Sequence, residues 1–184
     1  MARLVTENTD RSRPPAVPAG GDVVASGARD TGSADNARVH CPPPLIYLAA
    51  VVAAIGVGAF LPLPLPDSVG LGSLGGALVV IALVIALWGF REFRHHRNPL
   101  PPNRPVSELM TGGPFRFSRN PLYLALGLLQ AGLGLISRNA WILVALVPAL
   151  LVVRYYVIAR EEAYLTRQFG MLYRDYQARV RRWL

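Results

Sequence analysis

The sequence contains no lysine, since all 19 of its basic residues are arginine, and these stand against 11 Asp and Glu residues. The net charge of +8 does not indicate nucleic-acid binding, because the arginines are spread between apolar runs instead of gathering on one soluble face. A single cysteine, Cys41, excludes an intramolecular disulfide and a multi-cysteine metal site. We therefore expect neither a nucleic-acid partner nor a bound metal.

Residues 1–40 lack apolar periodicity and contain no aromatic residue. They are rich in Ala, Gly, Ser, Asp, Arg and Pro, and they carry five Arg against five Asp or Glu residues. This composition predicts a disordered tail. The tail also lacks the apolar core of about 7 to 15 residues that marks a secretory signal peptide, so no cleavage is expected within it.

Beyond residue 40 the chain is strongly apolar, and the whole sequence is 52% hydrophobic with a mean hydropathy of +0.33. This is too apolar for an ordinary soluble domain. Four apolar runs, 44–61, 69–90, 121–137 and 140–158, predict an all-α integral membrane protein of about four transmembrane helices. Residues 41–184 then form one membrane domain, with a polar loop at 91–120 and a C-terminal helix at 159–179.

The arginines that connect these runs predict the orientation. The 62–68 link has none and the 137–139 link has one, whereas the 91–120 loop and the stretch from residue 160 have six each. The positive-inside rule then places both termini and the 91–120 loop in the cytoplasm. Since an all-Arg, Ala-rich composition suggests a GC-rich bacterial genome, we expect the inner (plasma) membrane of a bacterium.

The first polar motif runs from residue 111 to residue 123. Gly113-Pro114 permits a tight turn with its backbone close to a ligand, and Pro121 suits the first turn of a helix. Asn120 is then the expected N-cap, next to a helix dipole that favours a carboxylate. The alternative is an interfacial loop whose arginines extend to lipid headgroups.

The second polar motif begins with Glu161 and Glu162, two adjacent carboxylates just beyond an apolar run. Such groups are costly near hydrocarbon unless they are paired or hydrated, which makes them possible ligand contacts. Helical spacing puts Glu161 on the face of Arg154 and Ile158, and Glu162 on that of Tyr155. The alternative is a solvated helix end with local ion pairs, whose possible partners are Arg154, Arg160 and Arg167.

Both motifs together resemble the signature of the isoprenylcysteine carboxyl methyltransferase family and its bacterial relatives, within a broader pattern shared with phospholipid methyltransferases. The first string is Gly113-Pro114-Phe115-Arg116-x-x-Arg119-Asn120-Pro121-x-Tyr123. The second is Glu161-Glu162-x-x-Leu165-x-x-x-Phe169-Gly170-x-x-Tyr173-x-x-Tyr176, followed by Val-Arg-Arg-Trp. The eukaryotic enzymes of that family usually have His at the position that Asn120 occupies in this sequence.

The resemblance implies an S-adenosylmethionine-dependent methyltransferase with a cytoplasmic cofactor pocket and S-adenosylhomocysteine as product. Its acceptor would be a lipophilic molecule from the bilayer whose carboxylate, amine or thiol receives the methyl group. Carried over by position, the cofactor-pocket residues are Gly113, Pro114, Phe115, Arg116, Arg119, Asn120, Tyr123, Glu161 and Glu162. The resemblance assigns no catalytic residue and does not decide which of the two carboxylates touches the cofactor.

The sequence is also compatible with two other functions. A steroid-reductase-like membrane enzyme would use NADPH at a similar cytoplasmic loop. A non-catalytic four-helix transporter or scaffold is the other, but an ion-coupled transporter should place ionisable groups inside its spans. The first three runs here have no charge, and only Arg154 lies within the fourth.

Overall fold

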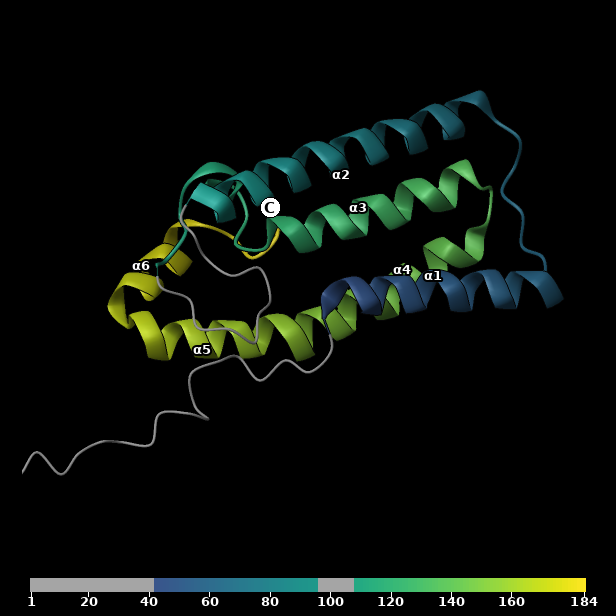
Figure 1. The fold of residues 1–184 in the computed structure, drawn as a ribbon. Coiled ribbons are helices and arrows are strands. Elements are labelled where there is room, and N and C mark those ends of the chain that lie inside the picture. Colours follow the sequence, from purple (N-terminus) through teal and green to yellow (C-terminus); the bar gives the residue numbers. More distant parts are fainter. Residues whose placement is uncertain (1–41, 96–107) are drawn as a thin grey trace, which may run out of the picture. The chain divides into compact units, whose positions relative to one another are not determined.

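The computed structural model describes residues 42–95 and 108–184. Within these ranges the chain is helical, and the helices run α1 to α6 in chain order with a 3₁₀ turn, η1, and a π-helical segment, η2 (Figure 1). The bounds are α1 Pro43–Phe60, α2 Val69–His95, η1 Gly113–Arg116, α3 Pro121–Ile136, α4 Ala140–Val152, η2 Val153–Ile158, α5 Ala159–Phe169 and α6 Met171–Arg179. The predictions for the 1–40 tail, for Cys41 and for the middle of the 91–120 loop lie outside the described residues.

Among the described residues, three helices are long and apolar enough to cross a membrane: α1, α2 and the continuous helix Ala140–Phe169. The apolar helix α3 is shorter, and its 16 residues cover about 24 Å against a hydrocarbon core of about 30 Å. The prediction of an all-α membrane protein is confirmed. In the described ranges the one β-type pairing is an isolated antiparallel β-bridge between Pro64 and Asn139.

The two links at one end of the helices are joined by backbone hydrogen bonds. Leu65 N donates to Arg138 O at 2.9 Å, and Ala140 N donates to Leu63 O at 3.0 Å. They use the N–H of Leu65 and the carbonyl of Leu63, which stand between prolines that have no N–H of their own. The links 61–68 and 137–139 therefore lie together, at the end of α3 opposite the first motif.

Helices α2 and α3 pack closely through glycine (Figure 1). A Cβ on Gly75 would lie 2.9 Å from Gly132 O, and a Cβ on Gly132 would lie 2.7 Å from Gly75 O. Of Gly72, Gly75 and Gly76 in α2, Gly75 makes this close contact, whereas the other two face open space. This contact holds the short α3 against α2, whose last turns lie beside the first motif.

The fourth apolar run and the carboxylates form one long helix, but a π-helical segment interrupts its regular turns. In η2 the hydrogen bonds widen to i→i+5, so the faces downstream rotate relative to a regular helix. Val157, Ile158 and Glu162 are buried, whereas Arg154 is exposed. The prediction that Arg154 and Glu161 share one helix face assumed a regular α-helical period, and η2 interrupts that period.

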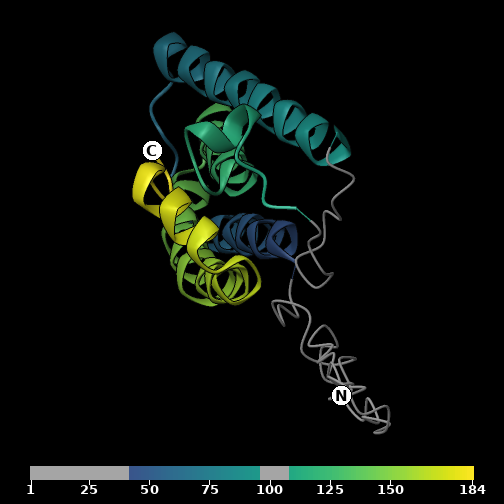
Figure 2. The ribbon, with the colours of Figure 1, turned by 90° about the vertical axis from the view of Figure 1, so that its left-hand side faces the viewer.

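The C-terminal helix predicted at 159–179 is divided in the structure at Gly170. This residue has φ +55° and ψ −123°, a conformation that glycine adopts and other residues rarely do. Helices α5 and α6 meet at this turn, and Figure 2 looks onto the end of the helices where they lie. The break lets Tyr173 and Tyr176 of α6 become buried instead of continuing outward with α5.

Candidate functional site at the polar end of the helices

The first motif turns against the end of α2. Gly113 has φ +50°, and a Cβ there would lie 2.8 Å from Glu92 Oε2 and 3.1 Å from Trp88 Nε1. A Cβ on Gly112 would also collide with Glu92 Oε1. Both the positive φ and the lack of space explain the glycine pair, so Gly113 shapes the turn through its backbone.

Pro114 and Phe115 are buried within this turn and Arg116 is exposed. The ring of Phe115 packs edge-on against Phe93 of α2, with ring centroids 5.8 Å apart. Its carbonyl oxygen accepts a hydrogen bond of 2.7 Å from the hydroxyl of Tyr176. Phe115 therefore connects the motif to α2 and α6, and the structure places the Arg116 side chain outside this packing.

Asn120 occupies the N-cap position of α3, as predicted, but its side chain does not cap the helix. The amide nitrogen Nδ2 donates instead to Arg182 O at 3.0 Å. The N-cap interpretation of the side chain is therefore corrected, because the C-terminal segment supplies a nearby acceptor. Ser118 Oγ accepts from Asn120 N at 3.1 Å and fixes the backbone there.

Tyr123 joins the two motifs directly. Its hydroxyl donates to Glu161 Oε1 at 2.5 Å, across 38 residues of sequence. The backbone carbonyl of Tyr123 accepts from the hydroxyl of Tyr47 in α1 at 3.2 Å. Glu161 is half-buried and uses one of its two carboxylate oxygens, Oε1, in this bond.

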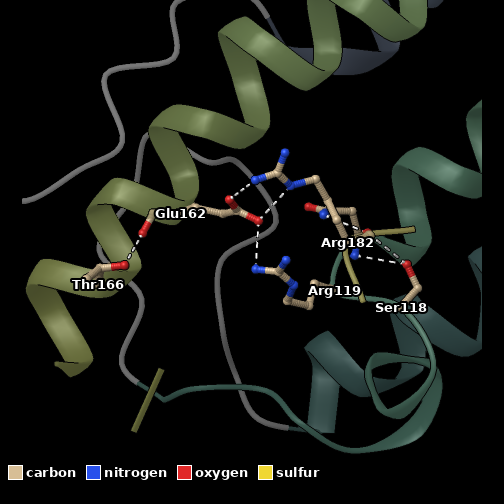
Figure 3. Close-up of polar contacts among 6 residues, drawn as sticks. Ser118, Arg119, Glu162, Thr166 and Arg182 are labelled. Carbon is tan, nitrogen blue, oxygen red and sulfur yellow. Dashed lines mark hydrogen bonds and ion pairs between the residues drawn. The ribbon is translucent and has the colours of Figure 1, made fainter. Parts of the chain in front are cut away.

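Glu162 lies between two guanidinium groups (Figure 3). Arg182 binds both of its oxygens, with Nε 3.1 Å from Oε1 and Nη2 2.6 Å from Oε2. Arg119 Nη1 lies 2.8 Å from Oε1. Only 12% of the Glu162 side chain is exposed. The alternative of local pairing with Arg154, Arg160 or Arg167 is corrected, because the partners come from the first motif and the C-terminal segment.

Arg119 has donors that Glu162 does not satisfy. Nη1 is within ion-pair distance of the carboxylate, but its N–H groups are not aligned for a hydrogen bond. Both Nε and Nη1 are buried and have no hydrogen-bond partner in the described part of the chain. Buried donors of a charged group are costly to leave unpaired, so this guanidinium is suited to receive an anionic group.

The C-terminal segment 180–184 completes the site. Arg119 N donates to Arg181 O at 3.0 Å, and Ser118 Oγ donates weakly to Arg182 O at 3.4 Å. Trp183 packs on a buried cluster that includes Tyr47 and Ile158. The segment therefore ties the start of α3 to α5.

Burial and charge shift the titration of groups at this end. Burial raises the pKa of Tyr173 to about 12, with a smaller contribution in the same direction from the Glu162 charge and an opposing one from Arg119. Burial also raises the pKa of Tyr176, whose hydroxyl donates to Phe115 O. The hydrogen bonds to Glu162 raise the pKa of Arg182. Both tyrosines are therefore protonated donors at neutral pH, and the guanidinium of Arg182 is charged.

Of the nine residues predicted for the site, the structure brings together Arg119, Asn120, Tyr123, Glu161 and Glu162. Gly113, Pro114 and Phe115 support this group from the turn against α2, and Arg116 is exposed. Their contact with a cofactor stays a prediction. In residues 42–95 and 108–184, no group of three or more His, Cys, Asp or Glu side chains is placed to hold a metal.

The residues that the site prediction missed are Tyr47, Ser118, Tyr173, Tyr176 and Arg182. Arg182 carried a detectable signal, because it stands in the terminal Val-Arg-Arg-Trp string. The tyrosines of α6 stand in the second string. Tyr47 and Ser118 had no such signal, since their roles come from hydrogen bonds to backbone atoms distant in sequence.

Replacing Glu162 with Gln removes the anion that lies between two guanidinium groups. Because a buried charge without its partner is strongly unfavourable, Glu162→Gln should lose about 3 kcal/mol of unfolding free energy. The measurement is the unfolding temperature of purified protein in detergent. Asp175→Asn is the matched control, since Asp175 is exposed and its substitution should change stability by no more than about 0.5 kcal/mol. Equal unfolding temperatures for the two variants would identify Glu162 as a solvated helix end.

Comparison with known proteins agrees with this arrangement. The sequence profile described as phospholipid methyltransferase matches residues 72–171, which extend from α2 across the first motif and the first part of the second to the start of α6. An uncharacterised protein of Haemophilus influenzae is 40% identical over 63 residues, which are 34% of this chain and the whole of that protein. No solved structure matches the chain. With more than half of its length matched by the profile and its apolar helices described above, the chain belongs to the phospholipid methyltransferase family and is an integral membrane methyltransferase.

Proposed function

We propose that the protein transfers a methyl group from S-adenosylmethionine to a lipophilic acceptor that reaches the site from the bilayer. The observation that carries this proposal is the meeting of the two motifs through the Tyr123–Glu161 hydrogen bond, beside the two nitrogens of Arg119 that form no hydrogen bond. One end of the helices thus presents a carboxylate and a guanidinium, which are the groups needed to bind an amino acid linked to a ribose.

The residues present fit this cofactor. The buried donors of Arg119 suit the carboxylate of its methionine part, since a guanidinium forms strong charge-assisted hydrogen bonds to a carboxylate. The second oxygen of Glu161 suits the ribose diol or the methionine ammonium. Glu162 is a poorer candidate, because Arg182 already binds both of its oxygens. We therefore assign the cofactor-facing role to Glu161, a choice that spacing alone left open.

When bound, S-adenosylmethionine would supply a methyl group on a positively charged sulfur. The acceptor would bond to the methyl carbon, and the sulfur would leave as the neutral thioether S-adenosylhomocysteine. The protein's task is to hold the reacting atoms in line and to exclude water. Arg119, Tyr123 and Glu161 perform the holding, and they are themselves fixed by the C-terminal segment and by Tyr47. A carboxylate acceptor loses no proton, whereas an amine or thiol would release one, and we propose Glu161 as the group that accepts it.

A lipophilic acceptor is supported by the surroundings of the site. The helices that lead to it are apolar and expose large side chains along their length, including Leu83, Leu87 and Trp88 of α2. A molecule dissolved in the bilayer would thus move along these helices to the polar end. We propose that its reactive group is a carboxylate, amine or thiol, as in isoprenylcysteine or a lipid headgroup, and that membrane lipids surround the helices.

The first test is ligand binding by calorimetry in detergent. Wild type should bind S-adenosylhomocysteine more tightly than NADPH or ATP, and Glu161→Gln should weaken this binding by about tenfold or more, the equivalent of one charge-assisted hydrogen bond. Asp175→Asn, an exposed carboxylate away from the site, should bind as wild type does. Preference for NADPH would favour the reductase alternative, and absence of nucleotide binding would favour a non-catalytic protein.

We further propose that the polar end faces the cytoplasm of a bacterium, where this cofactor is available, and that the protein lies in the inner membrane. The arginine-rich segments beyond α2 and beyond η2 support this orientation. In a Cys41→Ser background, Ser68→Cys should react with an impermeant thiol reagent from the periplasmic side, whereas Asp175→Cys should not. The reverse pattern would reject this orientation.

A further inference from the structure

The last residues of the chain bind the first motif through backbone atoms and the second motif through one side chain. The carbonyl oxygens of Arg181 and Arg182 accept from Arg119 N and from Asn120 Nδ2, each at 3.0 Å. The guanidinium of Arg182 then extends to Glu162 (Figure 3). The position of Arg182 is thus fixed at its backbone and at its tip.

The charges in this cluster do not balance. Two guanidinium groups, from Arg119 and Arg182, share the single carboxylate of Glu162, so the group carries one surplus positive charge. The sharing is also unequal. Arg182 forms two hydrogen bonds, one to each oxygen, whereas Arg119 approaches one oxygen without an aligned hydrogen bond.

We propose that Arg182 is a positioning residue, which occupies both oxygens of Glu162 and so keeps the donors of Arg119 free for the carboxylate of the cofactor's amino-acid part. This inference rests on the proposed function. Arg182 itself contacts Glu162 and acts on the ligand only through Arg119.

Without Arg182, Arg119 would pair differently with Glu162. One guanidinium and one carboxylate form the two parallel hydrogen bonds of a bidentate pair when nothing else competes for them. With Arg182 absent, Arg119 would turn into such a pair with Glu162, and the cluster would have no net charge. The surplus charge and the free donors would both disappear.

The experiment compares two ligands that differ in the amino-acid part. S-adenosylhomocysteine has the carboxylate, whereas 5′-methylthioadenosine retains the nucleoside and lacks the carboxylate and the ammonium. Arg182→Gln should weaken binding of the first ligand by about tenfold or more, the equivalent of a lost charge-assisted hydrogen bond, and leave binding of the second nearly unchanged. A general loss of structure would reduce binding of both.

Three further variants test the role of charge. Arg174→Gln removes the same charge from an exposed side chain of α6 that makes none of the contacts described for the site, and it should bind both ligands as wild type does. Arg182→Lys keeps the charge beside Glu162 and should retain most of the affinity. The double variant Glu162→Gln with Arg182→Gln restores the surplus charge on Arg119, so it should bind S-adenosylhomocysteine within about threefold of wild type, although each mutation removes a contact.

The outcomes separate this inference from the proposed function. Failure of wild type to bind S-adenosylhomocysteine would refute the proposed function itself. If wild type binds and Arg182→Gln loses affinity equally for both ligands, or if the double variant binds no better than Arg182→Gln, then Arg182 is only a structural tie and the inference is overturned.

Discussion

The arrangement of the polar end depends on the ion pairs of Glu162. This carboxylate lies within a helix that continues from a membrane-spanning segment, where an uncompensated charge is expensive. It is tolerated because two arginines from other parts of the chain approach it within 2.6 to 2.8 Å. Satisfying one buried charge therefore brings together the start of α3, the helix α5 and the C-terminal segment.

The same requirement separates two carboxylates that are adjacent in sequence. Glu162 is paired with two guanidinium groups inside the protein, and Oε1 of Glu161 accepts a hydrogen bond from Tyr123. Adjacent residues of a helix point about 100° apart, so one can face a structural cluster while the other faces a ligand. In a membrane methyltransferase this division lets Glu162 hold the first motif and the C-terminal segment with both of its oxygens. Glu161 uses Oε1 for Tyr123, and we assign its other oxygen to the cofactor.

Much of the fold could be predicted from the sequence, because a long uncharged apolar run in a bilayer forms a helix and a proline-rich link ends one. The predicted run at 44–61 corresponds to α1 at Pro43–Phe60, and the 69–90 run extends to His95 in α2. The π-helical segment η2 and the break at Gly170 were not predictable, since a local sequence pattern assumes a regular helical period.

The candidate site was predicted in part for a related reason. Sequence motifs identified which polar residues gather, but not how they pair. Asn120 was expected to cap α3 and binds Arg182 O instead, and Glu162 was expected to face a ligand or a local arginine. Both differences come from the C-terminal segment, whose contacts span about 20 to 60 residues of sequence and so leave no local pattern.

The central claim is methyl transfer to a lipophilic acceptor at the Tyr123–Glu161 end of the helices. It is tested most directly by incubating the purified protein with bacterial lipid extract and S-adenosylmethionine that carries an isotopically labelled methyl group, followed by mass spectrometry of the organic phase. The account predicts that wild type adds labelled methyl to a lipophilic compound and that Glu161→Gln does so much more slowly. Absence of any labelled lipophilic compound with wild type, or equal labelling by Glu161→Gln, would contradict it.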